Sequence, residues 1–386
     1  MSTPVRRALG ATVMVLVLVM AAACSGSSSP EASPGTTAAA VPARSAVIAQ
    51  LVDQVMVPGY QRMEASSQAL AGAVDSLCAA PSPEALAQAQ QAWRDTNTAW
   101  NVTEAYRFGP AMDKATTVEY PVDEAKVKKL LAAAKPPTPF TAESLNALGS
   151  DVRGLEAIEL VLFSPEAPGD LDARRCSYAQ AATQIVARAA KDVRTAWTDG
   201  AGGKRSFAAQ LKAPGSDSTI MTEQMAITEI VNGSISALGA VSDKRLGRAS
   251  GEVTGTPLPA ETDAGPAHTA LTDATDILRS VQDVFVGTDA SGSAAGRTPG
   301  GAAPGGLQAL IASQSSTTGP NLVAALRDAT TAIQAIPSPL ASVPVSDVAA
   351  VKAANLQVRA ARLILRTEVA SQLGVTLTFS DSDGDS

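Results

Sequence analysis

Long stretches of the chain place apolar residues at the three- and four-residue steps of an amphipathic helix. The segment 151–163 is an example, and its recurring apolar residues are Val152, Leu155, Ile158 and Leu162. Alanine, leucine, glutamine and arginine fill many such runs, and all four favour helix. Strict alternation of apolar and polar residues, which would indicate strands, is nearly absent, and aromatic residues make up only 3% of the chain. The pattern therefore predicts an all-α protein.

Proline, glycine and capping residues divide these runs into separate helices. The predicted helices are, in chain order, 47–77 with a kink or break at Pro58-Gly59, 83–108, 123–134, 141–164, 177–198, 221–246, 269–285, 321–335 and 345–373. Short connections between long helices favour neighbours that pack up and down against each other. At ~150 residues per domain, the chain after residue 42 is long enough for two cores. We predict two tandem up-down helical bundles related by a duplication, at 43–203 and 204–386.

The first 42 residues have a different pattern. Arg6 and Arg7 precede an apolar run at 11–23, which is the layout of a secretory signal peptide, and Cys24 follows three alanines as in a bacterial lipoprotein processing site. Residues 24–42 are rich in Ser, Pro, Gly, Thr and Ala and predict a flexible tether. We therefore expect a chain that is secreted across the cytoplasmic membrane and lipid-anchored through Cys24 on its outer face. The alternative is ordinary cleavage that leaves Cys24 as a free thiol.

The cysteine count agrees with this compartment. Lipidation of Cys24 leaves Cys78 and Cys176 as an even pair in an oxidising environment, and we predict a disulfide that joins one helix end to another. The alternative is two buried free thiols.

The charge of the chain excludes one class of partner. The formal net charge is −7, and removal of Arg6 and Arg7 with the signal peptide takes it to −7 − 2 = −9. An acidic chain with few basic clusters is a poor candidate for nucleic acid, so we expect no nucleic-acid partner and attachment to the membrane through the lipid.

Two carboxylates stand out on the predicted helix 141–164. Glu156 and Glu159 lie one turn apart, and Glu159 adjoins the apolar stripe. An isolated buried carboxylate costs several kcal/mol, so Glu159 must be paired, hydrogen-bonded or metal-bound. One interpretation is a boundary glutamate satisfied by Arg153 or by another helix. The other is a metal ligand.

A second set of residues shares one face of the helix 83–108. Trp93, Asn97, Trp100 and Glu104 follow each other at steps of four, three and four. The tryptophans are most simply core anchors. Glu104 either pairs with Arg107 or Arg153, or it joins Glu156 and Glu159 in an acidic cluster that needs a cation. Three carboxylates would suit Ca²⁺, Mg²⁺, Mn²⁺ or ferric iron better than zinc.

The order of several motifs resembles the imelysin-like family. Gly154 and Glu159 match its Gly–x–His–x–x–Glu signature, while Glu156 stands where the family most often has histidine. Further stretches that are similar to the family are 91–100, 104, 107–110, 229–233, 243–247, 373–379 and 383–385. The resemblance covers nearly all of the chain after the first forty residues.

This resemblance implies a function. The family has two helical halves, with its candidate site close to where they meet, and it is associated with iron handling at the cell envelope. It implies a protein that binds a metal ion, either for itself or for an envelope iron-uptake partner. Iron is the first choice of metal, and Ca²⁺ and Mn²⁺ are alternatives. It also implies that Glu261 is an acidic residue facing the first half and a weaker fourth ligand. Loss of the motif histidine removes the nitrogen ligand that the family normally offers.

Catalysis has little support in the residues, although some family members are named as peptidases. The chain has no His-Glu-x-x-His motif. Its one histidine, His268, follows Gly265-Pro266 at a helix start, where a solvated or capping role is usual. A carboxylate-only hydrolase and a scaffold without ligand stay open as alternatives to the binding component.

Overall fold

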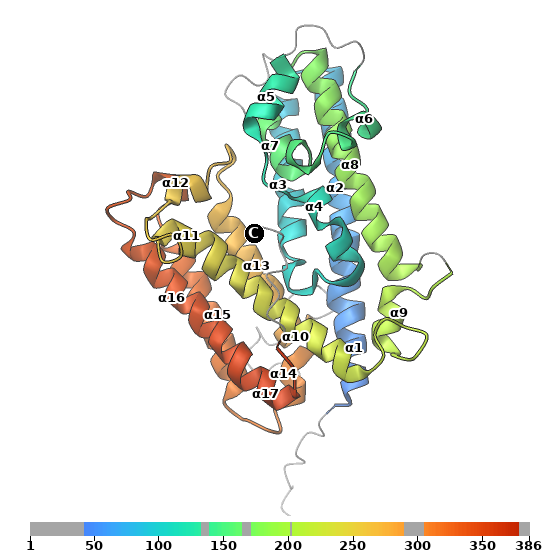
Figure 1. Cartoon of the computed structure of the whole chain (residues 1–386), viewed down its shortest axis with the longest axis vertical. Coiled ribbons are helices and arrows are strands. Elements are labelled where there is room, and N and C mark those ends of the chain that lie inside the picture. The colour runs from blue at the N-terminus through green and yellow to red at the C-terminus, as the bar shows by residue number, and fades with distance from the viewer. Residues whose placement is uncertain (1–41, 133–138, 164–170, 201–202, 289–304, 378–386) are drawn as a thin grey trace, which may run out of the picture. The chain divides into compact units, whose positions relative to one another are not determined.

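A computed structural model describes residues 42–132, 139–163, 171–200, 203–288 and 305–377 (Figure 1). Regular structure in these ranges is helical, with no β-strand, which confirms the all-α fold. The predicted signal peptide, Cys24, nearly all of the tether and the acidic end at 381–386 lie outside the described residues.

The α-helices are α1 Arg44–Leu51, α2 Val57–Ala79, α3 Pro83–Asn101, α4 Ala115–Val118, α5 Glu124–Ala132, α6 Ala142–Asn146, α7 Leu155–Leu162, α8 Ala173–Thr198, α9 Phe207–Lys212, α10 Glu223–Gly239, α11 Leu246–Ser250, α12 Pro259–Thr262, α13 Ala270–Val286, α14 Gly306–Ile311, α15 Thr318–Gln334, α16 Ala349–Ile364 and α17 Ala370–Leu373. Three π-helical turns continue longer helices: η1 Val52–Met56, η5 Ala240–Arg245 and η7 Leu365–Val369. Short 3₁₀ turns are η2 Glu104–Tyr106, η3 Gly109–Lys114, η4 Ser150–Val152 and η6 Leu340–Ser342.

The first helical run differs from its prediction at Pro58. The helix does not break there: the π-helical turn η1 runs directly into α2, of which Pro58 is the second residue. The predicted start of the next helix is confirmed, since the Ser82 hydroxyl accepts a hydrogen bond from the Ala85 N–H at 3.1 Å. That helix ends at Asn101, and the 3₁₀ turn η2 takes the place of its predicted last turns.

The predicted helix 141–164 is wrong as a single element. It is divided into α6, the 3₁₀ turn η4 and α7. Gly149 and Gly154 have φ angles of +118° and +89°, which interrupt a right-handed helix. The helix 151–163 expected from the apolar period therefore begins only at Leu155.

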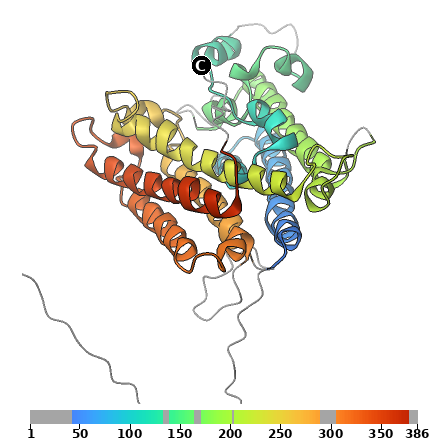
Figure 2. The same ribbon diagram turned by 60° about the horizontal axis from the view of Figure 1, so that its bottom comes forward.

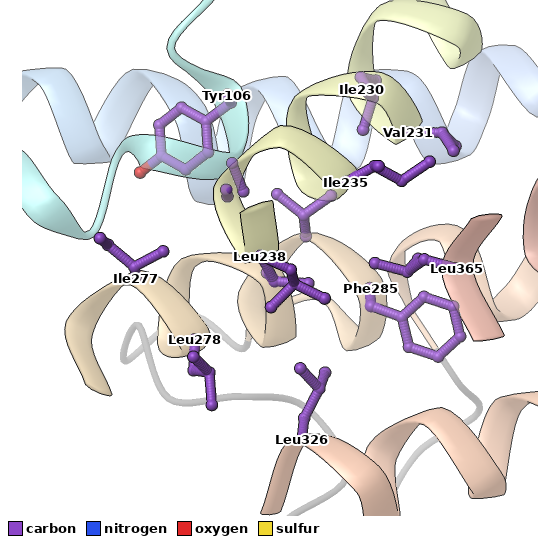
Figure 3. Close-up of a cluster of buried hydrophobic side chains, with 14 of the residues drawn as sticks. Tyr106, Ile230, Val231, Ile235, Leu238, Ile277, Leu278, Phe285, Leu326 and Leu365 are labelled. Atoms are coloured by element: carbon purple, nitrogen blue, oxygen red, sulfur yellow. The ribbon is translucent and has the colours of Figure 1, made fainter. Parts of the chain in front are cut away.

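Buried side chains form two clusters. The smaller one lies among α2, α3, α7 and α8, whose long members run side by side in Figure 1. The larger one is built mainly from α10, α13, α15, α16 and η7, but it also takes in α1, Tyr106 and Trp197 (Figure 3). The larger core thus draws on both predicted bundles, and the boundary at 203 and the duplication stay predictions.

Cys78 and Cys176 form the predicted disulfide, with a Cα–Cα distance of 5.6 Å. Cys78 is in the last turn of α2 and Cys176 in the first turn of α8, so the bond joins two helix ends. Closing a loop of this length stabilises a fold by roughly 2–5 kcal/mol.

One helical run in the described part of the chain, Glu223–Ser250, is long and apolar enough to cross a membrane by composition alone. It comprises α10, η5 and α11, and 56% of its apolar window is buried against the rest of the protein. Its apolar composition is therefore explained by its position in the core.

Candidate functional site

Helix α7 carries both glutamates of the motif, and its start is fixed from several sides. Gly154 precedes the helix, and a Cβ there would stand 2.8 Å from the Val118 carbonyl oxygen. The buried Trp93 donates its indole N–H to the Leu155 carbonyl at 2.8 Å. Tyr178 donates its hydroxyl to the Val152 carbonyl at 2.7 Å. These contacts hold the first turn of α7, and with it Glu156, in place.

Glu156 points toward the segment that follows α4. Its carboxylate accepts a hydrogen bond from the Val122 N–H at 2.9 Å. The pKa of Glu156 is raised to about 7, first by burial and then by the negative charges of Glu119 and Glu159, while the Val122 hydrogen bond and Arg245 act in the opposite direction.

Glu159 is 6% exposed and faces the loop before α13. Its carboxylate accepts a hydrogen bond from the Ala267 N–H at 2.8 Å. Gly265 packs directly against it, because a Cβ there would overlap the carboxylate oxygens. Burial raises the pKa of Glu159 to about 7, the Ala267 hydrogen bond opposes this, and Asp263 adds to it.

Asp263 organises the same loop. Its buried carboxylate accepts hydrogen bonds from the N–H groups of Ala270, at 3.2 Å, and Ala341, at 3.1 Å. The Nδ1 atom of His268 lies 3.5 Å from an Asp263 oxygen. His268 has a φ angle of +53°, unusual for a residue with a side chain. The loop therefore holds Glu159 through a backbone N–H rather than through an arginine.

A second group of charges lies beside Glu156. Trp100 donates its indole N–H to Glu119 at 2.7 Å, and Arg107 stacks on the Trp100 ring at 3.7 Å. Arg107 forms ion pairs with Glu104, at 2.6 Å, and with Glu119, at 3.6 Å. Arg245 reaches the other Glu119 oxygen at 3.7 Å. Glu119 is thus the junction of the group.

Asp273 in α13 completes this second group. Asn97 donates its side-chain N–H to Asp273 at 2.7 Å, and the Thr269 hydroxyl donates at 3.1 Å. Burial raises the pKa of Asp273 to about 7 against the opposing charge of Arg245. Burial disfavours the charge on Arg245, but Asp273 and the glutamates around it raise the pKa of this arginine overall. Asn97 and Asp273 link the first half of the chain to the second.

The structure places the predicted site residues in different surroundings. Glu104 pairs with Arg107, which was one of its two expected roles. Arg153 donates to the Asn146 carbonyl at 2.6 Å and to the Ser150 hydroxyl at 3.2 Å, so it binds the turn before α7. Glu261 is exposed on α12. Across the described ranges, no three His, Cys, Asp or Glu side chains gather closely enough to hold a metal ion together.

Sequence reasoning missed Glu119, Asp263, Asp273 and Arg245. Asp273 carried a signal, because it lies in the apolar stripe of α13 beside Ala270, Ala274 and Ile277. Glu119 and Asp263 lie just after short helices, where the sequence has no period that would show them to be near the site.

These features define an all-α protein with an acidic, partly neutralised cluster between α3, α7 and α13. The sequence matches the family model of imelysin, peptidase family M75, over residues 56–373, and the chain therefore belongs to the imelysin family. It is 31% identical over 200 residues to iron-regulated protein A of Synechococcus elongatus, a match that spans 51% of this chain and about half, 52%, of that protein.

Two solved structures have the same fold. One is from Parabacteroides distasonis and is proposed to be an iron-regulated protein A precursor, with a TM-score of 0.74. The other is an imelysin-like protein from Psychrobacter arcticum, with a TM-score of 0.67. Each is 20% identical to this chain and matches 87% of it and 97% of its own chain, a likeness that shows the fold alone.

Proposed function

We propose that this protein is an exported, iron-related binding component of the cell envelope that takes up a cation at Glu156 and Glu159. One observation carries the proposal. The two carboxylates lie on one short helix, Glu159 is buried and Glu156 is half-buried, and each has a pKa raised to about 7. A bound cation would relieve the cost of ionising them.

The charged groups around the two glutamates are mainly negative, which favours binding of a cation. The neighbouring carboxylates outnumber the neighbouring arginines, Arg107 and Arg245. The arrangement supplies fewer than three convergent ligands among the described residues, so water or a ligand carried with the metal would complete the coordination shell. All-oxygen coordination favours ferric iron, Mn²⁺ or Ca²⁺ over zinc. The iron-regulated name of the Synechococcus relative supports iron as the first choice.

Thermal melts of the metal-free protein, with and without ferric iron, Mn²⁺ and Ca²⁺, test this function. We expect one of these ions to raise the melting temperature of the wild-type protein by mass action, because a hundredfold excess of ligand over Kd stabilises the folded state by ~2.7 kcal/mol. Glu156→Gln and Glu159→Gln should each abolish the shift, and the exposed Glu261→Gln should keep it.

Two other outcomes would replace the proposal. Because the family carries a peptidase name, the same samples are given a denatured protein substrate. Cleavage by the wild type that is lost in Glu159→Gln would favour a hydrolase. An unchanged melting temperature with every ion, and no cleavage, would favour a scaffold.

The proposal places the protein on the outer face of the cytoplasmic membrane, held by a lipid on Cys24, where it would serve an envelope iron-uptake partner. Cys24→Ser should release the protein from the membrane fraction without lowering its melting temperature, since the tether separates the lipid from the folded body. Fractionation after a high-salt wash measures this. A variant that stays with the membrane would show a different anchor.

A further inference from the structure

The continuous helix formed by α16, η7 and α17 has two apolar rows. The core row contains Val351, Val358 and Leu365 at seven-residue steps, and all three side chains are fully buried. The second row consists of Leu356 and Leu363, also seven residues apart, which are 65% and 60% exposed. At about 100° per residue, the second row lies roughly 140° around the helix from the first, so the core does not cover it. Figures 1 and 2 show this helix, in red, on the outside of the molecule.

The two leucines of the second row are the most exposed large apolar side chains in the part of the chain that the structure describes. One exposed leucine is ordinary on a protein surface, but two on one helix face form a surface that favours a partner. Arg359 stands between them and is paired with Glu252 at 3.8 Å, so this pair adds no net charge. Lys352 lies on the same side, is exposed, and forms no ion pair with a described residue. A lysine beside exposed leucines is typical of a helix that lies on a lipid surface.

The chain enters its fold beside the C-terminal end of this helix. Arg44, in the first turn of α1, donates to the Leu373 carbonyl of α17 at 3.5 Å. Gln224 joins these two residues, because its side chain accepts a hydrogen bond from Arg44 and donates to the same Leu373 carbonyl at 3.1 Å. A lipid on Cys24 would therefore be linked to this end of the helix.

The predicted tether is long enough to bring a membrane to the exposed row. With a rise of about 1.5 Å per residue, Leu363 and Leu356 lie roughly 15 Å and 25 Å along the helix from Leu373. A random chain as long as residues 25–42 spans roughly 23 Å between its ends. These lengths are similar, so both leucines lie within reach of an anchored membrane surface.

We propose that the row of Leu356 and Leu363 rests on the lipid surface to which the chain is anchored. The proposal depends on the lipid at Cys24 proposed above, because the tether decides which face of the protein is near the membrane. A contact linked in this way has an effective concentration on the order of millimolar, so a patch too small to bind from solution is sufficient. The contact fixes the orientation of the folded body, with the outer side of α16 toward the membrane.

Tryptophan fluorescence on vesicles tests this orientation. The chain from Cys24 onward is coupled through the Cys24 thiol, the one cysteine outside the disulfide, to a maleimide lipid in vesicles of phosphatidylcholine and phosphatidylglycerol. We expect the new tryptophan of Leu356→Trp or Leu363→Trp to emit at shorter wavelength on the vesicles, because the indole ring enters the lipid interface. It should also lose emission when the lipid chains are brominated. The three native tryptophans are at most 2% exposed and supply a constant background.

Leu148→Trp is the matched control. Leu148 is 51% exposed and follows α6, which lies at the opposite end of the ribbon from α1 and α17 in Figure 1. Its tryptophan should neither shift nor lose emission on the same vesicles. Thermal melts verify that all three variants fold.

The coupling supplies the anchor, so the result does not depend on whether the cell lipidates Cys24. No metal is added either, so a failure here is separate from a failure of the cation site. Emission that is unchanged at Leu356→Trp and Leu363→Trp, or that changes equally at Leu148→Trp, overturns the proposal. A shift at Leu363→Trp that occurs without vesicles and grows with protein concentration would mean that a second copy of the chain covers this face, and it would overturn the proposal too.

Discussion

Replacing Gly154 with alanine is expected to lower the free energy of unfolding by about 3 kcal/mol. Gly154 has φ +89° and ψ −172°, a region of the backbone map that only glycine occupies without strain. The added Cβ would also stand 2.8 Å from the carbonyl oxygen of Val118, which is backbone and has little freedom to move. Urea unfolding followed by circular dichroism measures the loss.

Gly72→Ala is the matched control for this substitution. Gly72 lies in the interior of α2, is exposed, and has nothing within 4 Å of the position of a Cβ. Alanine there should stabilise the protein by roughly 0.5–1 kcal/mol, through helix propensity. Equal effects at the two glycines would contradict the strained cap on α7.

Local signals account for what the sequence could predict. The three- and four-residue period identified the all-α fold, and Ser82 with Pro83 fixed the start of α3, because both depend on neighbours within one turn. The pairing of Cys78 with Cys176 followed from the count of cysteines rather than from geometry. The helical period of apolar residues gave a wrong helix start near Gly154. The apolar spacing continues across this residue, although its positive φ angle interrupts the helix.

Of the candidate site, the sequence predicted only the residues that α7 contributes. Glu159 was placed correctly in the buried stripe, but its partner is the Ala267 N–H, 108 residues away, and no periodicity encodes such a contact. The contact between Asn97 and Asp273 spans 176 residues. Of the two roles expected for Glu104, the ion pair with Arg107, three residues on, is the one observed. Tertiary contacts thus decide which carboxylates are short of a partner.

Glu159→Gln is expected to stabilise the metal-free protein by up to about 3 kcal/mol above pH 7. The pKa of Glu159 is about 7 in the folded protein against an ordinary value of 4.5. Below pH 4.5 the carboxyl is protonated in both states and costs nothing. Between pH 4.5 and 7 this carboxyl binds more protons in the folded state than in the unfolded state, so its contribution to wild-type stability falls as pH rises through this window.

Glutamine separates the charge from the hydrogen bond. Its amide oxygen can still accept from the Ala267 N–H, so only the ionisation is removed. Unfolding measured from pH 4 to pH 8 should therefore show wild type and variant alike at the acid end and diverging toward pH 8. Glu261→Gln, at an exposed glutamate, should stay within ~0.5 kcal/mol of wild type throughout. A Glu159→Gln protein that is less stable than wild type at every pH would mean that a cationic group of the protein already pairs with this carboxylate. The proposal that Glu159 lacks a cation in the metal-free protein would then be wrong.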